Sequence, residues 1–192
     1  GKVTFDGLDV TGYPSWKMAR LGLARTFQVV RPLKEMTVYE NILVGAYMRY
    51  SDTVKANEVA EHCVDLCFLG DLRNKLAGGL TIGNKKRLEV ARSLATGPKL
   101  LLLDESVAGL TSTEVKEMVD VIVRLKEEGV TILMVEHIME AIMPIADKIV
   151  VLASGKKIAE DSPQAVINDP TVIKAYFGEK FAQRLRVCEV EQ

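Results

Sequence analysis

The sequence lacks any long apolar run and any excess of charge of one sign. No stretch approaches the roughly twenty consecutive apolar residues that a membrane-spanning helix needs, and no charged segment with an apolar core after it opens the chain. We therefore expect neither a transmembrane helix nor a secretory leader in these residues. Twenty-five basic and 26 acidic side chains give a formal net charge of −1, so charge does not favour nucleic acid or an anionic membrane as a partner.

Cysteine is also scarce. The 192 residues contain three cysteines, Cys63, Cys67 and Cys188, and an odd number without repeated CxxC pairs argues against a disulfide framework or a zinc site. Reduced thiols in a cytosolic protein fit this pattern better. The spacing of Cys63 and Cys67 places both on one face of a helix, where we expect small apolar packing rather than metal binding.

A further absence is the phosphate-binding loop GxxxxGK[ST], which occurs nowhere in the sequence. In P-loop hydrolases this loop supplies the backbone cradle, the phosphate-binding lysine and the metal-binding hydroxyl. Most direct contacts to a triphosphate would therefore be missing. The first residue is Gly1 rather than methionine, and a hairpin predicted around Asp6 and Gly7 follows at once. We expect the sequence to begin inside a domain.

The most informative segment that is present covers residues 100–105, four leucines followed by Asp104 and Glu105. Four consecutive leucines cannot alternate between a wet and a dry face, which predicts a strand covered on both faces in a parallel sheet. Ligands bind at the carboxyl ends of such strands, where Asp104 could hold the Mg²⁺ of a nucleoside triphosphate and Glu105 could polarise the attacking water. The alternative is an acidic turn or helix cap after a buried strand.

The pattern that follows predicts a helix and a second buried strand. Thr111 and Glu114 have the spacing of a capping box at the start of a helix over residues 114–128, and β-branched residues begin a strand over residues 130–135. Polar residues end this strand too, His137 among them. Parallel strands end at one edge of a sheet, so two acids and an imidazole could converge on one ligand.

Weaker patterns complete the expected elements. They are a helix that Ser15 caps, an extended segment over residues 23–27 that ends at Gln28, helices over residues 38–50, 54–68 and 83–95, a hairpin around residues 154–155, and helices over residues 163–167 and 171–177. The helix over residues 83–95 is amphipathic, with Leu88 and Ala91 on its apolar face and charged residues, including Lys86 and Glu89, on the rest. Strands alternating with helices indicate an α/β fold.

At this point the sequence resembles the ATP-binding subunits of ABC transporters. Five motifs carry the resemblance in the family's order: the Q-loop at Gln28, the signature at residues 80–84 with Thr81, Gly83 and Asn84, the Walker B aspartate Asp104 with the catalytic glutamate Glu105, the D-loop at Gly109, and the switch histidine His137. Within this superfamily the segments 21–28, 36–41 and 158–178 are most similar to the ATPases of branched-chain amino acid importers.

The resemblance implies a fold and its partners. The fold is a RecA-like parallel-sheet P-loop NTPase core, here incomplete, with an inserted helical subdomain over about residues 34–97 and a C-terminal hairpin and helices over about residues 148–180, in one ABC-type ATPase domain spanning residues 1–192. Two such subunits, identical or related, enclose two ATP·Mg²⁺ and drive solute import through transmembrane permease subunits. A solute-binding protein takes part indirectly, and nucleic acid does not. The subunit is peripheral, at the cytoplasmic face of the plasma (inner) membrane.

The resemblance also assigns roles to residues. Glu105, His137 and Gln28 would be catalytic, and Asp104 and Gln28 would bind the metal. Nucleotide contacts would come from Asp104, Gln28, Thr81, Gly83, Asn84, Gly109 and His137, the signature residues reaching the nucleotide of the second subunit. Alternatives stay open: Gln28 could be an ordinary loop amide, Gly83 a capping glycine and His137 a cap of the following helix.

Several positions depart from the family pattern. Thr81 keeps the signature hydroxyl, Ile82 removes a glycine and Asn84 shortens the usual glutamine; Ser106 stands where proline is usual and Thr111 where the D-loop often has Asp or Asn. The family places its P-loop upstream of the point where this chain begins. The sequence therefore predicts an N-terminally truncated ATPase that is inactive as it stands.

Two other functions stay open. One is a non-catalytic partner subunit that contributes only a signature face, although such a subunit has no need of Glu105. The other is an ABC ATPase without a transporter, although these usually carry two ATPase domains, large insertions or basic surfaces.

Apolar residues near residues 31–50 could contact a membrane subunit or form the core of the helical subdomain. They are Val30, Leu33, Met36, Val38, Tyr39 and Ile42.

Overall fold

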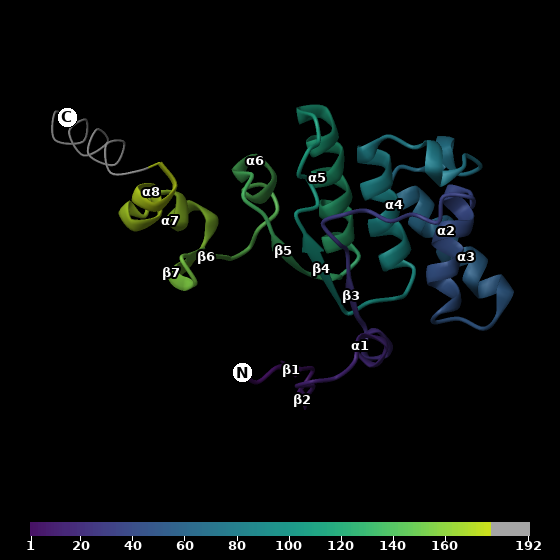
Figure 1. Cartoon of the computed structure of the whole chain (residues 1–192), viewed down its shortest axis with the longest axis horizontal. Coiled ribbons are helices and arrows are strands. Elements are labelled where there is room, and N and C mark those ends of the chain that lie inside the picture. Colours follow the sequence, from purple (N-terminus) through teal and green to yellow (C-terminus); the bar gives the residue numbers. More distant parts are fainter. Residues whose placement is uncertain (178–192) are drawn as a thin grey trace. The chain divides into compact units, whose positions relative to one another are not determined.

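A three-stranded parallel sheet organises the first part of the computed structural model, which describes residues 1–177 (Figure 1). Its strands are β3 (Leu23–Arg25), β4 (Leu100–Asp104) and β5 (Thr131–Val135), in the order β3-β4-β5. The register pairs Leu100 with Leu23 on one side and with Thr131 on the other. The strands therefore end at one edge, as the sequence predicted.

One face of β4 is buried and the other is not, so the prediction of a strand covered on both faces is wrong for the described residues. Leu101 and Leu103 are fully buried, whereas Leu100 and Leu102 are only partly covered. On β5 Leu133 is 58% exposed. An apolar run indicates that a strand is buried. It does not indicate which faces are covered, because the covering elements are distant in the sequence.

Helix α5 (Ser112–Glu127) follows β4 and connects it to β5 (Figure 1). Its capping box is present, since the carboxylate of Glu114 accepts hydrogen bonds from the Thr111 backbone N–H and hydroxyl, both at 3.0 Å, and Thr111 in turn accepts from Glu114 N. One face is buried in the core through Val115, Met118, Val121, Ile122 and Leu125. The predicted strand–helix–strand unit is confirmed.

Three helices pack together between β3 and β4 in the sequence: α2 (Val38–Tyr47), α3 (Thr53–Leu66) and α4 (Ile82–Leu94), with short 3₁₀ turns at Gly70–Leu72 and Ala77–Gly79. Gly45 is required where α2 crosses α4, because a Cβ there would lie 2.2 Å from the backbone oxygen of Arg92. Cys63 and Cys67 are buried free thiols, and burial raises the pKa of Cys63 to about 12. This fits the apolar packing expected for them.

The chain begins with a hairpin of β1 (Thr4–Phe5) and β2 (Leu8–Asp9), followed by α1 (Ser15–Leu21). Pro14 occupies the cap position of α1 and no side chain caps the helix, so the prediction that Ser15 caps it is wrong. Ser15 is instead the first helical residue. The proline ring fixes φ near the helical value, so the helix begins directly after Pro14, one residue earlier than predicted.

By their contacts the residues divide into two compact units, Gly1–Ala141 and Ile142–Gln192. In the second, β6 (Ile149–Ala153) and β7 (Lys156–Asp161) form the expected hairpin, and α7 (Pro163–Ile167) and α8 (Pro170–Phe177) follow; α6 (Met139–Ile142) lies at the division. Val151, Val166 and Val172 pack together. Gly178 at the end of the family-like tail segment, the predicted boundary at residue 180 and Cys188 lie outside the described residues.

Among residues 1–177 none of the helices combines the length and the apolarity that crossing a bilayer requires. The helical subdomain expected over residues 34–97 stays a prediction, because these helices belong to the same compact unit as the sheet.

Candidate nucleotide site

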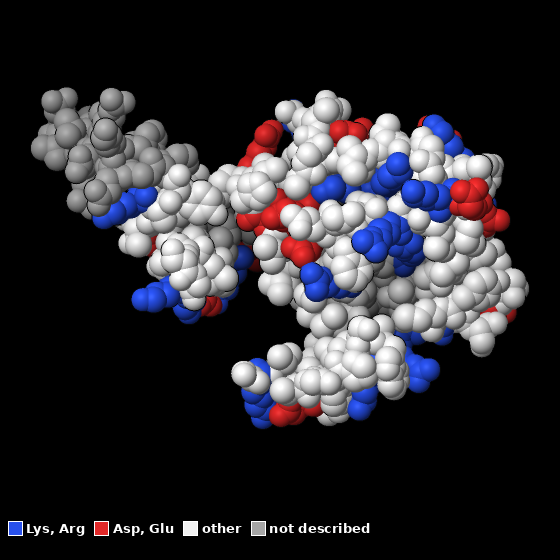
Figure 2. Space-filling view, in the orientation of Figure 1, with Lys and Arg blue, Asp and Glu red and all other residues white. Residues whose placement is uncertain are grey.

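Two of the predicted catalytic residues are in direct contact at the carboxyl edge of the sheet. Gln28 follows β3 and Glu105 follows β4, and the Gln28 side-chain amide donates a hydrogen bond to Glu105 Oε2 at 2.6 Å. Asp104, the last residue of β4, lies beside them and pairs in register with Val135 of β5. Acidic side chains gather over the ends of β4 and β5 in Figure 2.

The backbone of Glu105 is held from three sides. Its φ of 47° lies in the left-handed region, which non-glycine residues seldom adopt. Its N–H donates to Val135 O at 3.0 Å, and its carbonyl oxygen accepts from Lys86 Nζ at 2.7 Å and from Ala108 N at 3.3 Å. These contacts fix where the Glu105 side chain leaves the chain.

Arg25, which the sequence interpretation did not single out, forms an ion pair with Asp104. Arg25 Nη2 lies 2.8 Å from Asp104 Oδ2, and its guanidinium lies over the ring of Phe27, 5.3 Å from the centroid. β3 pairs with β4 in parallel, and the side chain at the end of one strand reaches the acid at the end of the other. The contact depends on the pairing of β3 with β4, and no local sequence pattern predicts that pairing.

The donor set suits Mg²⁺ in part. With Gln28 donating through its nitrogen and Asp104 Oδ2 paired with Arg25, the Gln28 amide oxygen and Asp104 Oδ1 remain as oxygen donors. Mg²⁺ in phosphate-transfer sites is typically held by one or two protein oxygens together with substrate phosphates and water. The described residues contain no group of three or more His, Cys, Asp or Glu side chains that could hold a metal by themselves.

His137 lies two residues beyond Val135, at the same edge of the sheet as Asp104 and Glu105. Its side chain is exposed. The preceding Glu136 accepts a hydrogen bond from Val107 N at 2.8 Å and so joins the end of β5 to the loop after β4. The structure thus places His137 near the acids through the backbone, and its contact with a phosphate stays a prediction.

The signature residues form the start of α4. Thr81 is the cap of this helix, its hydroxyl accepting from Asn84 N at 3.3 Å, so Gly83 is the second helical residue and the reading of Gly83 as a capping glycine is wrong. A Cβ on Gly83 would lie 2.4 Å from Oε1 of Glu114. A Cβ here would displace the end of the Glu114 side chain, whose carboxylate caps α5 and lies against the first turn of α4.

Gly109, the predicted D-loop residue, is exposed in the loop between β4 and α5 and has a φ of 75°. Glycine adopts this conformation without strain. Thr81, Gly83 and Asn84 make no hydrogen bond to Gln28, Asp104 or Glu105 within the described residues. The resemblance implies no direct contact between these two groups of residues, because the signature would bind the nucleotide of a second subunit.

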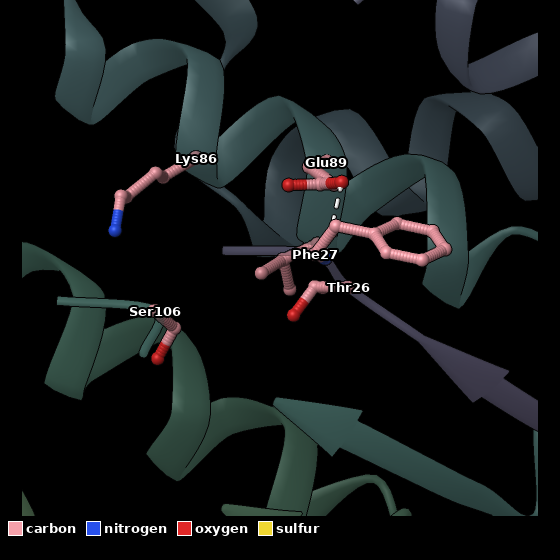
Figure 3. Close-up of a pocket in the computed structure, with 6 residues that line it drawn as sticks. Thr26, Phe27, Lys86, Glu89 and Ser106 are labelled. Atoms are coloured by element: carbon pink, nitrogen blue, oxygen red, sulfur yellow. Dashed lines mark hydrogen bonds between the residues drawn. The ribbon is translucent and has the colours of Figure 1, made fainter. Parts of the chain in front are cut away.

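Lys86 and Glu89 are buried, so their assignment to the charged outer side of α4 is wrong. They are 6% and 5% exposed. Burial lowers the pKa of Lys86, which nearby carboxylates oppose, and burial raises the pKa of Glu89, which the hydrogen bond from Phe27 N opposes. Both line a small pocket with Thr26, Phe27, Val90 and Ser106 (Figure 3).

Ser106 contributes a polar atom to the same pocket. Its hydroxyl is buried and has no hydrogen-bond partner among the described residues. The family pattern usually has proline at this position. The serine found here instead places a hydrogen-bond donor and acceptor in the pocket with Lys86 and Glu89. The interleaving of Lys86 and Glu89 with the apolar Leu88, Val90 and Ala91 was the only sequence signal for burial.

Comparison with known proteins decides the family. A family model described as "ABC transporter" matches residues 1–108, and one described as "Branched-chain amino acid ATP-binding cassette transporter" matches residues 156–182. The chain belongs to the ABC transporter ATP-binding family. The motif-based resemblance and the α/β fold with a RecA-like parallel core are therefore confirmed.

Relatives of this cassette carry names from amino acid transport. The high-affinity branched-chain amino acid transport ATP-binding protein BraF of Pseudomonas aeruginosa is 38% identical over 195 residues, covering 93% of this chain and 76% of BraF. The probable branched-chain amino acid transport ATP-binding protein LivG of Archaeoglobus fulgidus is 37% identical, covering 93% of this chain and 74% of LivG.

Solved cassettes share its fold. MJ1267, an ATP-binding cassette of an ABC transporter, superposes with a TM-score of 0.80 at 30% identity, covering 92% of this chain and 76% of MJ1267. The ATP-binding cassette MJ0796, in a dimeric post-hydrolysis state bound to ADP and Pi, superposes with a TM-score of 0.74 at 20% identity, covering 85% of this chain and 73% of MJ0796. The second likeness shows the fold alone. The family to which the cassette belongs is one of ATP-hydrolysing subunits.

Of the apolar residues near residues 31–50, some are buried in the core and others are exposed at the surface. Val38 and Ile42 are fully buried in the helical core, which rules them out as contacts for a partner, whereas Leu33 is 40% exposed. Further exposed apolar side chains in this region are Phe27, Val29, Val44, Tyr47 and Met48. A contact surface here would therefore consist of these residues rather than of Val38 and Ile42.

Proposed function

We propose that this cassette is the ATP-binding and ATP-hydrolysing subunit that drives solute import through an ABC transporter, and that the solutes are branched-chain amino acids. The observation that carries the proposal is the contact of Gln28 with Glu105 beside Asp104 at the carboxyl edge of the sheet. Family membership supports ATP as the ligand. The names of BraF and LivG support the solute class.

Each residue at the edge has a distinct part in this proposal. Asp104, through Oδ1, and Gln28, through its amide oxygen, would hold Mg²⁺, while Asp104 Oδ2 stays paired with Arg25. Mg²⁺ would neutralise charge on the phosphates. Glu105 accepts a proton from the attacking water, Gln28 orients that carboxylate, and His137 donates a hydrogen bond to the terminal phosphate.

The proposed assembly contains a second ABC ATPase subunit, identical or related, and transmembrane permease subunits. Thr81, Gly83 and Asn84 at the first turn of α4 would face the nucleotide of the second subunit, where backbone N–H groups and the helix dipole attract phosphate. A solute-binding protein takes part indirectly through the permeases. The cassette would be peripheral, at the cytoplasmic face of the plasma (inner) membrane.

Transport in reconstituted vesicles tests this function. The complete product of the gene, with its permease subunits, is placed in vesicles that enclose Mg·ATP, and uptake of radiolabelled leucine is measured with the solute-binding protein outside. We expect uptake to require ATP and to disappear in Glu105→Gln. Uptake of leucine that persists in Glu105→Gln would point instead to a subunit that contributes only a signature face, and ATP-dependent uptake of another solute class would overturn the solute assignment.

The permease contact is tested in the same vesicles by cysteine crosslinking from the exposed positions Leu33, Val44 and Tyr47, with the exposed α5 residue Lys116 as control. Crosslinks from the first three positions and none from Lys116 are expected. Failure at all three would count against this surface.

A further inference from the structure

Two buried side chains of α4, one helical turn apart, bind the two chain segments that carry the catalytic residues. Lys86 Nζ donates to the carbonyl oxygen of Glu105 at 2.7 Å, and Glu89 Oε1 accepts from the backbone N–H of Phe27 at 3.3 Å. In Figure 3 Lys86 extends from α4 away from Glu89, whose carboxylate lies over the Phe27 amide. One helix thus contacts both the Gln28 segment and the Glu105 loop.

The bond from Lys86 matters because of the conformation of Glu105. A left-handed backbone persists in a residue with a side chain only where the surroundings hold it. Within residues 1–177, the Glu105 carbonyl accepts one further hydrogen bond besides that from Lys86, the weaker 3.3 Å bond from Ala108 N. Loss of the ammonium would therefore free this peptide group to rotate and turn the Glu105 side chain away from Gln28.

The bond to Glu89 restrains the other catalytic partner. Phe27 immediately precedes Gln28 and is 60% exposed, so its backbone hydrogen bond to Glu89, rather than burial of its side chain, fixes this segment. On the strand side, Thr26 Oγ1 accepts from Asp104 N at 3.3 Å and Thr26 N donates to Leu102 O at 2.9 Å. Residues 26 and 27 are therefore bound to β4 on one side and to α4 on the other.

Because both charged side chains are buried, they do not act as ordinary solvent-exposed surface residues. A lysine and a glutamate this far from water lose hydration that a surface position would keep, and apolar residues would pack at lower cost. Their carboxylate and ammonium groups are instead used on backbone groups of the site. We propose that Lys86 and Glu89 are positioning residues that hold Glu105 and Gln28 in the geometry needed for ATP hydrolysis.

This inference rests on the proposed function, and steady-state ATPase assays of the complete transporter test it. Lys86→Met removes the donor at nearly constant length, and Glu89→Leu removes the acceptor. We expect kcat to fall about 10- to 100-fold while KM for Mg·ATP changes less than about threefold, because small displacements of reacting groups act on the chemical step. Lys86→Arg, which keeps a donor, and Glu89→Gln, which keeps an acceptor, should restore most of the rate.

Lys116→Met is the matched control, since Lys116 is exposed on α5 and lies outside the pocket. It should leave both constants unchanged. Where Lys86→Met does not fold, Lys86→Gln replaces it: its polar end tolerates burial but is too short to reach the Glu105 carbonyl. A folded Lys86→Met or Lys86→Gln with normal kcat, or a rise in KM alone, would overturn the proposal.

Amide hydrogen exchange separates this inference from the proposed function. Glu89→Leu should accelerate exchange at the Phe27 amide, which donates to Glu89, and Lys86→Met should accelerate exchange at the Ala108 amide, which shares the Glu105 carbonyl. These changes do not require turnover. If the unaltered protein hydrolyses no ATP, the proposed function fails while exchange still decides whether the two side chains hold these segments; unchanged exchange at both amides would overturn the positioning role.

Discussion

Glu105 combines a strained backbone with a carboxylate that already has a hydrogen-bond donor. Its φ of 47° directs the side chain out of the line of β4, and Gln28 donates to it at 2.6 Å. A carboxylate held in this way is oriented before any substrate arrives, which favours proton transfer over a freely rotating acid. The left-handed residue is therefore found where orientation matters most for the proposed reaction.

Replacing Glu105 by glutamine in the complete protein should slow ATP hydrolysis by at least about 100-fold while nucleotide binding survives. The amide keeps the size and hydrogen bonding of the carboxylate but cannot accept the proton. Single-turnover hydrolysis and equilibrium binding of Mg·ATP are measured on the same preparation. Glu127→Gln, an exposed position at the end of α5, is the control. Near-normal turnover in Glu105→Gln would remove this residue from its catalytic role.

Gly83→Ala should fail to give the stabilisation of about 1 kcal/mol that alanine in place of glycine usually brings to a helix. The new Cβ would meet Glu114 Oε1 at 2.4 Å and displace the carboxylate that caps α5, at a cost of about 1 kcal/mol in the free energy of unfolding. Urea denaturation measures the change. Gly79→Ala is the control, because nothing lies within 4 Å of a Cβ there. In a Glu114→Ala background the stabilisation should return, and its continued absence would show that another contact is responsible.

Residue-level prediction succeeded where the signal lay at strand ends. Asp104, Glu105 and His137 were expected at one edge of the sheet, and the strand register places them there. Gln28, expected at the end of an extended segment, donates a hydrogen bond to Glu105. Lys86 and Glu89 were placed on the charged outer side, since a pattern of charges on a helix does not reveal which ones meet buried backbone groups. Arg25 escaped notice because its partner Asp104 lies 79 residues away in the sequence.

Elements with strong local signals were predicted within a few residues. The capping box of α5 and its flanking strands were anticipated from residues 100–135 alone, and each is present. The helix predicted over residues 38–50 ends at Tyr47, since apolar spacing continues beyond the last regular turn. The covering of β4 could not be anticipated, because it depends on which elements lie over each face rather than on the strand itself.

The capping of α5 makes part of the stability depend on pH. Hydrogen bonds from the Thr111 backbone and hydroxyl, with a further bond from the Gly83 backbone, hold the pKa of Glu114 below its ordinary value. A lowered folded-state pKa stabilises the native state above the unfolded pKa of about 4.3, and this contribution is lost as pH falls through the folded value. The charged form of Glu114 therefore supports α5 at every pH above about 4.3 and ceases to do so in acid.

Glu114→Gln should lower the free energy of unfolding at pH 7 and have a smaller effect as pH falls below about 4, where Glu114 of the unaltered protein becomes protonated. Urea denaturation at a series of pH values measures the difference between the two proteins. Glu127→Gln should give no comparable dependence. A difference that grows on acidification would mean that the carboxylate is not the stabilising form.

At the scale of the whole molecule, charge and apolar surface are distributed differently. Acidic side chains gather over the ends of β4 and β5 in Figure 2, and basic ones gather beside them, although the net charge is only −1. Exposed apolar side chains are found in many elements; on β5 they are Leu133 and Val135, 58% and 61% exposed, and β5 pairs only with β4 among the described residues. Open strand edges with apolar neighbours promote association between chains.

A polypeptide of these 192 residues alone should bind Mg·ATP poorly and hydrolyse none of it. A triphosphate brings about four negative charges, and the GxxxxGK[ST] loop that would cradle them does not occur in the sequence. The groups that remain at the edge are Gln28, Glu105, His137 and the ion pair of Arg25 with Asp104; the two acids need a metal before they can attract phosphate, and Asp104 neutralises Arg25. The signature cannot substitute, because it would serve a second subunit whose site has the same composition.

Thermal denaturation with and without millimolar Mg·ATP tests this expectation. A ligand present at 100 times its Kd stabilises a native protein by about 2.7 kcal/mol, which raises Tm by several degrees, so the expected absence of a shift is readily distinguished. The complete product of the gene, measured in parallel, is the positive control for the nucleotide and the metal. The open edge of β5 makes aggregation on heating the expected end of the transition, and light scattering records it. A large, saturable shift of Tm in the 192-residue polypeptide would mean that it contains a phosphate site formed by residues other than those at the edge of the sheet.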